Sequence, residues 1–164
     1  MTLDRRSFIK STLLTSCSFL LPPAILDLWA GEEQSLRLGL ITDLHKDIIH
    51  DPDLRLQTFL DSLKSVQPHA KIQLGDFAIP KKENQPFIDS FNQDSIPSLH
   101  VMGNHDLDEG YTKEQVIQTF GMPAAYYAQV IQGVRILVLD GNDPGSLKST
   151  GGYASYIGKA QQNW

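Results

Sequence analysis

The sequence contains a single cysteine, Cys17. One cysteine cannot form an intrachain disulfide, and it excludes zinc sites built from several cysteines. Basic residues are also scarce, because 14 Lys and Arg stand against 19 Asp and Glu, which gives a net charge of −5. This acidic balance argues against non-specific nucleic-acid binding, which needs a basic face to displace counterions.

Long apolar runs are missing as well. The mostly apolar run Ser11–Leu21 is shorter than the about 20 residues that a membrane-spanning helix needs. Hydrophobic residues make up 41% of the chain and charged residues 20%, which is too apolar for a disordered tail. With 164 residues, the chain is expected to form one domain whose core needs no disulfide.

The first 30 residues differ from the rest of the chain. Arg5-Arg6 is followed by Phe8-Ile9, then by Lys10 and the apolar run. This order resembles the bacterial twin-arginine export signal, and it implies the twin-arginine export machinery as a partner. The protein is then expected to be exported, to the periplasm or the outside of the cell. The alternative is an ordinary Arg-Arg pair on the surface of an amphipathic helix.

Two processing sites suit this segment. Cleavage near Leu28–Ala30 would divide the chain into a signal peptide of residues 1–30 and a folded portion of residues 31–164. The sequence Leu14-Thr15-Ser16-Cys17 instead looks like a lipoprotein cleavage box, which would leave Cys17 lipidated. Contact with a membrane is expected only through the signal or through this lipid.

The pattern after residue 35 predicts alternating strands and helices. Apolar runs bounded by polar residues favour strands, and apolar residues at helical spacing after Asp51-Pro52 favour a helix that stops before Pro68. The predicted order is strand, helix, strand, helix, strand, helix, hairpin and the start of a helix, over residues 36–42, 52–67, 70–74, 87–91, 96–102, 112–120, 126–139 and 156–164. This is the pattern of a layered α/β domain.

Polar residues follow each of the first three predicted strands. They are Asp43-Leu44-His45, Gly75-Asp76 and Gly103-Asn104-His105-Asp106. The carboxyl ends of strands form the ligand-binding edge of an open α/β sheet, so the three groups are expected to converge. On an extended segment, the side chains of Asp43 and His45 would lie on one face.

These residue types suit a metal site. Carboxylate, amide and imidazole groups are hard to borderline ligands, which favour Mn, Fe or Zn over thiophilic metals. Asp76 has two oxygens and is able to bridge two cations. Gly75 and Gly103 permit tight turns and a close approach of the backbone to a ligand.

The three groups, in this order and spacing, resemble the N-terminal signature of the calcineurin-like metallophosphoesterases. The resemblance covers residues 38 to about 106 and implies that family's four-layer α/β/β/α sandwich. It implies that Asp43, His45 and Asp76 hold the first of two metal ions. Asp76 would bridge to the second ion, which also takes Asn104.

The resemblance also implies a reaction. His105 would donate to the phosphate or protonate the leaving oxygen, and Asp106 would orient His105 as a hydrogen-bond acceptor. Water activated between the ions would attack phosphorus in line. The expected function is therefore hydrolysis of a phosphate ester, with His105 and Asp106 in catalytic roles and with Mn, Fe or Zn as the two ions.

The sequence departs from the family after His105. The family completes its site with a lone His and a Gly-His-x-His, and no histidine follows His105 here. Gly158, Gln162 and Trp164 resemble the stretch that precedes those groups. We therefore expect only about the N-terminal half of the sandwich. The alternative function is a catalytically inactive, truncated module that binds metal or a partner.

Simpler interpretations exist for single residues. His45 alone could be a loop histidine, and Asp76 could cap a turn after Gly75. Asn104 could adopt a left-handed turn conformation for backbone reasons. His100 is expected in a strand, without a functional role.

Overall fold

The computed structural model describes residues 35–144 and 155–164. The predicted signal peptide and Cys17 lie outside the described residues. Within these ranges the structure contains α-helices, β-strands and the short 3-10 helices η1 and η2. They are β1 (Leu38–Ile41), α3 (Pro52–Val66), β2 (Ala70–Gln73), η1 (Lys82–Asn84), α4 (Gln85–Asn92), β3 (Ser98–His100), η2 (His105–Gly110), α5 (Lys113–Phe120), β4 (Tyr127–Ile131), β5 (Val134–Val138), and, near the end, α6 (Lys159–Gln162).

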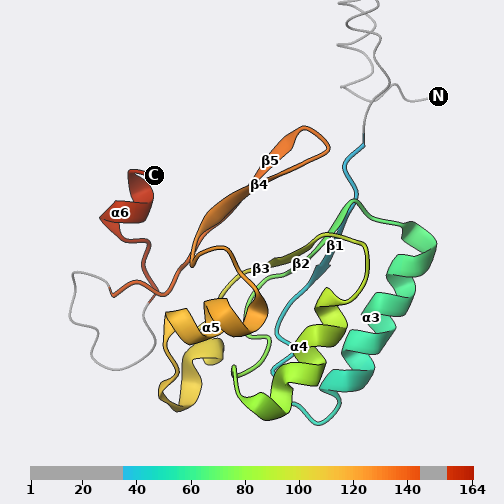
Figure 1. The fold of residues 1–164 in the computed structure, drawn as a ribbon, viewed down its shortest axis with the longest axis horizontal. Coiled ribbons are helices and arrows are strands. Elements are labelled where there is room, and N and C mark those ends of the chain that lie inside the picture. Colours follow the sequence, from blue (N-terminus) through green and yellow to red (C-terminus); the bar gives the residue numbers. More distant parts are fainter. Residues whose placement is uncertain (1–34, 145–154) are drawn as a thin grey trace, which may run out of the picture. The chain divides into compact units, whose positions relative to one another are not determined.

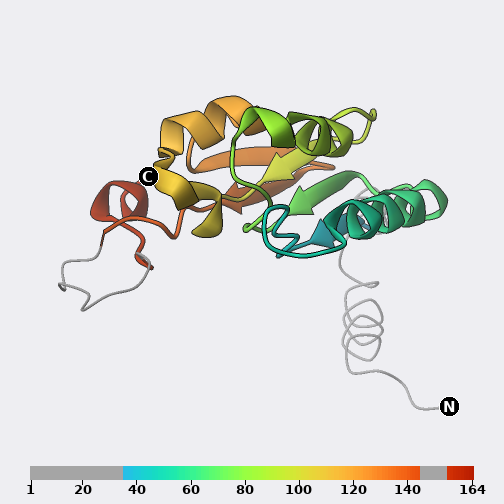
Figure 2. The ribbon, with the colours of Figure 1, turned by 90° about the horizontal axis from the view of Figure 1, so that it is seen from below.

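A parallel three-stranded sheet forms the centre, in the order β1-β2-β3. All four residues of the middle strand, β2, are buried. Helices α3 and α4 pack side by side next to this sheet (Figure 1), and the strands run alongside one another in the turned view (Figure 2). The mixed α/β architecture with a parallel sheet is the fold class that the sequence predicts.

Helix α3 begins where the sequence places it, with Pro52 in its first turn. The side chain of Asp51 does not cap this helix; it accepts a hydrogen bond from Nε of Arg55 at 2.7 Å. The helix ends at Val66, and the next residue, Gln67, adopts a left-handed conformation immediately before Pro68. Proline disfavours the helical conformation in the residue before it, which explains this stop.

Helix α5 begins with a capping box. The hydroxyl of Thr112 accepts from the backbone N–H of Gln115, while the Gln115 side chain accepts from the N–H of Thr112. This reciprocal pair satisfies two N–H groups that a helix start otherwise leaves unbonded. Gly121 ends the helix in a left-handed conformation at φ 73°.

Strands β4 and β5 form the predicted antiparallel hairpin, which turns at Gln132 and Gly133. Both turn residues have positive φ, as tight hairpins of this length require. The hydroxyl of Tyr127 bonds both the backbone N–H and the carbonyl of His100, each at 3.0 Å. This contact joins the hairpin to the edge of β3.

The final segment, residues 155–164, contacts the chain after β5 through backbone hydrogen bonds of Tyr156 and through a buried glutamine. The side chain of Gln161 bonds both the backbone N–H and the carbonyl of Asp140, at 2.8 and 2.9 Å. Asp140 is itself buried and forms an ion pair with Lys113. Gln162, the glutamine that the family resemblance singles out, is exposed, so the neighbouring Gln161 makes the anchoring contacts.

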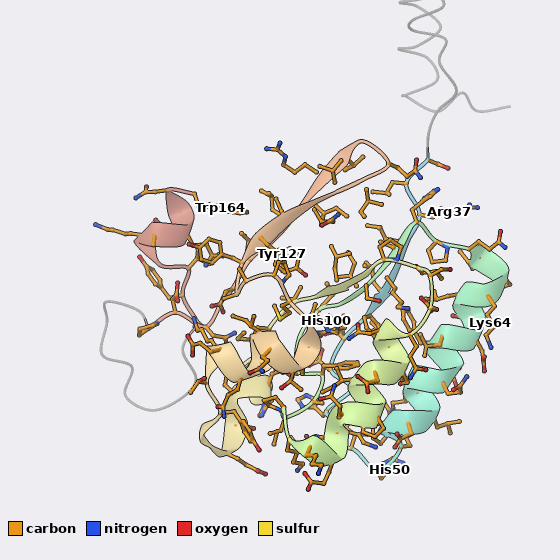
Figure 3. All side chains as sticks on the ribbon, in the orientation of Figure 1. Arg37, His50, Lys64, His100, Tyr127 and Trp164 are labelled. Atoms are coloured by element: carbon orange, nitrogen blue, oxygen red, sulfur yellow. The ribbon has the colours of Figure 1, made fainter. Side chains whose placement is uncertain are left out.

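The core lies between the sheet and helices α4 and α5. His100 lies in β3, as expected, and its ring sits in the middle of this core (Figure 3), in contact with the rings of Phe77, Phe91 and Phe120. Burial lowers the pKa of His100 to about 3, and the charge of Lys71 acts in the same direction. The imidazole is therefore neutral in the folded protein at all ordinary pH values.

This buried histidine makes stability depend on pH. Unfolding restores an ordinary pKa near 6.5, so below that pH the unfolded chain binds a proton that the folded chain does not. The stabilisation from His100 is complete above pH 6.5 and is lost as the pH falls toward 3. Between pH 7 and pH 5 the loss is about 2 kcal/mol.

We expect the His100→Gln variant to reveal this contribution in urea denaturation at both pH values. The difference in free energy of unfolding between the natural chain and the variant should shrink by about 2 kcal/mol from pH 7 to pH 5. A difference that stays constant with pH would show that the buried imidazole does not resist protonation.

Among the described residues, no helix combines the length and apolar character that crossing a membrane requires.

Candidate metal centre

The three polar groups converge because the chain after β1 runs along the chain after β2. The N–H of Asp43 donates to the carbonyl of Gly75 at 3.2 Å, and the N–H of His45 donates to the carbonyl of Asp76 at 2.9 Å. The third group is joined to the second, since the N–H of His105 donates to Oδ1 of Asp76 at 2.9 Å. The predicted convergence at the carboxyl edge of the sheet is what the structure shows.

Gly103 allows the second and third groups to touch. A Cβ at this position would lie 2.1 Å from the backbone nitrogen of Asp76 and 2.9 Å from the carbonyl carbon of Gly75. Both distances are impossible for real atoms. Only glycine therefore permits the observed approach of the two loops, whereas the sequence predicts a close approach of the backbone to a ligand.

The backbone is strained at three residues of the site. Asp43, His45 and Asp76 have φ of 55°, 41° and 52°, in the left-handed region that costs non-glycine residues free energy. The segment from Asp43 to His45 is therefore not extended, and the prediction from extended geometry is wrong in that respect. Strain of this kind persists only where surrounding contacts impose it, and it gathers at functional sites.

The side chains nevertheless meet. Nε2 of His45 lies 3.6 Å from Oδ1 of Asp43 and 3.8 Å from Oδ2 of Asp76. Among the described residues, His45, Asp76 and His105 form a cluster in which one ligand atom of each lies within 4.8 Å of the others. The rings of His45 and His105 meet edge to face, with centroids 4.9 Å apart.

These separations suit a bound cation. Two ligand atoms that are each about 2.1 Å from one ion lie at most about 4.2 Å apart, and 3.6 and 3.8 Å fall within this limit. The other ring nitrogen of His45, Nδ1, is buried without a hydrogen-bond partner among the described residues. The carboxylate and imidazole donors around Nε2 are of the kind that a transition-metal ion prefers.

The cluster lines a small pocket with a volume of about 10 Å³. Its walls come from the segment after β1, the segment after β2 and helix η2. Asp47 shapes one wall, because its carboxylate accepts from the N–H of Ile79 and from the amide of Asn84, and pairs with Lys81.

His105 is held by a residue that the sequence motifs did not indicate. Its Nδ1 lies 2.7 Å from Oδ2 of Asp108, three residues further along η2. The Asp108 carboxylate also holds the pKa of His105 above its usual value. The spacing of three residues would have indicated this pair, had the segment after His105 been recognised as a helical turn.

Asp106 has a different task from the one predicted. Its Oδ1 accepts from the N–H groups of Phe77 and Ala78, and its Oδ2 accepts from the N–H of Gly103. Burial raises the pKa of this carboxyl to about 7, while the three N–H donors act in the opposite direction. Asp106 thus ties the two loops together by their backbones, and the carboxylate that holds Nδ1 of His105 is that of Asp108.

Asn104 lies at the start of η2 and is half-buried. Its φ of −73° and ψ of −33° are right-handed, so the left-handed alternative for this residue is wrong. Its predicted part in holding a second ion stays a prediction, as does the bridging role of Asp76. In the structure, Oδ1 of Asp76 is bonded to the N–H of His105, which leaves Oδ2 facing His45.

Comparison with known proteins agrees with this geometry. The sequence model of the calcineurin-like phosphoesterase family matches residues 36–162, which is well over half of the chain. The chain therefore belongs to the calcineurin-like phosphoesterase family. No curated protein matched it.

Proposed function

We propose that this protein is an exported hydrolase of phosphate esters that uses two metal ions. The observation that carries the proposal is the cluster of His45, Asp76 and His105 at the carboxyl edge of the sheet, in a chain of this family. When bound, the ions acidify a water molecule and neutralise charge on the phosphoryl oxygens. Mn, Fe and Zn all suit the donor set.

Each residue of the candidate metal centre has its own role in this proposal. His45 and Asp76, with Asp43 beside them, hold the first ion, and Asn104 takes part in holding the second. His105 donates a proton to the leaving oxygen, because its ring faces His45 across the cluster and is fixed from behind by Asp108. Asp106 keeps the loops of Asp76 and His105 in register through its three backbone bonds.

The test is metal-dependent hydrolysis. The protein is stripped with a chelator, loaded with Mn²⁺, Zn²⁺ or Fe²⁺, and assayed on p-nitrophenyl phosphate and bis(p-nitrophenyl) phosphate. We expect hydrolysis only with metal, and loss of activity on renewed chelation. Absence of hydrolysis with every ion, in protein that binds the ions, would contradict the enzyme function.

The His105→Ala variant distinguishes the two roles open to this residue. As a proton donor, His105 should contribute about 10²–10⁴-fold to kcat without affecting the metal content. Metal content is measured by mass spectrometry of the purified variant. Loss of bound metal would make His105 a ligand instead. His50→Ala is the control, since His50 has a side chain that is 88% exposed and lies outside the cluster.

A second candidate function is an inactive module that binds metal or a partner. It is favoured by one observation: among the described residues, the possible ligands that come together are the three of this cluster, which is enough for one ion. The number of ions bound per chain separates the two functions. Two ions with hydrolysis support the enzyme, whereas one ion without hydrolysis supports the inactive module.

The export part of the proposal is supported by the order of residues around Arg5-Arg6. Replacing both arginines by lysine should stop recognition by the twin-arginine machinery. Fractionation of bacterial cells would then find the variant inside the cytoplasm and the natural chain in the periplasm or medium. Equal distribution of both would contradict export by this route. The acidic charge gives no support for a nucleic-acid partner.

A further inference from the structure

Gln73 is a polar side chain in a place that favours an apolar one. It is the last residue of β2, the strand buried along its whole length, and its side chain is completely buried. Inner strands of parallel sheets are usually apolar, because a buried amide is costly unless all its groups are bonded. The presence of an amide here therefore calls for an explanation in its contacts.

These contacts connect the two loops of the metal centre. Oε1 of Gln73 accepts from the N–H of Gly75 at 2.7 Å, in the turn that leads to Asp76. Nε2 donates to the carbonyl of Val101 at 2.9 Å, two residues before Gly103. A single side chain thus fixes the backbone on both sides of the place where Gly75 and Gly103 meet.

His100 determines which way the amide of Gln73 points. Nδ1 of His100 lies 3.2 Å from Nε2 of Gln73, and these two residues are partners in the register of β2 and β3. Because the amide nitrogen only donates, Nδ1 accepts, and the ring proton is on Nε2. That nitrogen lies 2.8 Å from Oδ1 of Asn92, whose own amide donates to the carbonyl of Phe120.

We propose that Gln73 is a positioning residue for the candidate metal centre. Its carboxamide, oriented by His100, holds the backbone of Gly75 and Val101 at the separation that places Asp76 beside His45 and His105. The left-handed φ of Asp76 and the bond from the N–H of His105 to its Oδ1 depend on that separation. The effect on metal binding rests on the proposed function; the effect on the loops does not.

The first test measures Mn²⁺ affinity of the Gln73→Met variant by titration calorimetry. Methionine has a similar length and cannot make the hydrogen bonds. We expect affinity to fall about 10- to 100-fold, as for other residues that orient metal ligands. Leu56→Ala is the control, because it removes buried side-chain volume in α3, a helix that supplies no residue of the cluster. Unchanged affinity in Gln73→Met, or an equal loss in Leu56→Ala, would overturn the proposal.

The second test needs no metal. Hydrogen exchange of the His105 N–H, which is bonded to Asp76, is followed by NMR in metal-free protein. We expect exchange to accelerate about 10-fold or more in Gln73→Met, and less in Leu56→Ala. Unchanged exchange would overturn the positioning role. A natural chain that binds no Mn²⁺ would contradict the proposed function alone, and the exchange data would still decide the role of Gln73.

If Gln73→Met does not fold, Gln73→Asn takes its place. Asparagine keeps the carboxamide and buries no charge, but its side chain is one methylene shorter and cannot bond Gly75 and Val101 together. We expect Mn²⁺ affinity to fall and exchange of the His105 N–H to accelerate relative to the natural chain. Natural values for both quantities in Gln73→Asn would overturn the proposal.

Discussion

The Gly103→Ala variant is expected to lose both bound metal and stability. A Cβ at this position would meet the nitrogen of Asp76 at 2.1 Å and its Oδ1 at 2.2 Å. Backbone atoms on both sides cannot yield, so the loops must move apart and take Asp76 away from His105. Overpacking of this severity costs about 3 kcal/mol or more of the free energy of unfolding. Urea denaturation and metal content of the purified variant measure the two effects.

Gly141→Ala is the matched control for this change. A Cβ there meets nothing within 4 Å, and the residue has no left-handed φ that would strain an alanine. Its free energy of unfolding should stay within about 0.5 kcal/mol of the natural value, with metal binding retained. If Gly103→Ala behaved like Gly141→Ala, the close approach of the two loops could not be what assembles the centre.

The convergence of the site could be predicted because it depends on topology. Parallel strands place their carboxyl ends at one edge, so polar residues that follow β1, β2 and β3 meet however the loops are shaped. The boundaries of the helices could also be predicted from the sequence, because Pro52, Thr112 and Gly121 act on the local backbone conformation. These predictions need only the neighbouring residues or the order of the strands.

The internal arrangement of the site could not be predicted in this way. The left-handed conformations of Asp43, His45 and Asp76 are imposed by hydrogen bonds between loops that are distant in sequence. The same applies to Asp106: its sequence position beside His105 suggested a bond to the ring, but the fold brings three N–H groups to its oxygens instead. Adjacent residues in a helical turn point in different directions, which is why Asp108 holds the ring.

Gln73 illustrates the same limit in the core. Its sequence context, between Ile72 and Leu74, is that of an ordinary buried strand. The partners of its amide come from β3, from the residue after β3 and from the turn after β2, and only the fold shows that they lead into the two loops of the site. A buried polar residue in an apolar strand is the signal that would have identified it.

Asp76→Asn is expected to abolish metal-dependent hydrolysis. The substitution keeps the size of the side chain and an oxygen for the N–H of His105, so the loops should stay in place. It removes the negative charge that faces Nε2 of His45, at the centre of the cluster. Because a catalytic ion contributes several kcal/mol to the reaction, loss of its anionic ligand should reduce the rate to that of the stripped protein.

Two measurements on Asp76→Asn separate loss of the ion from loss of structure. Metal content should fall, while the free energy of unfolding in chelator should change little or rise, because Asp76 lies close to Asp43 and to the buried Asp106. Asp61→Asn is the control, since it makes the same change of charge on the surface of α3, where Asp61 pairs with the exposed Lys64. That variant should keep full activity. Full activity in Asp76→Asn itself would remove Asp76 from the metal centre, and with it the bridging role proposed for its two oxygens.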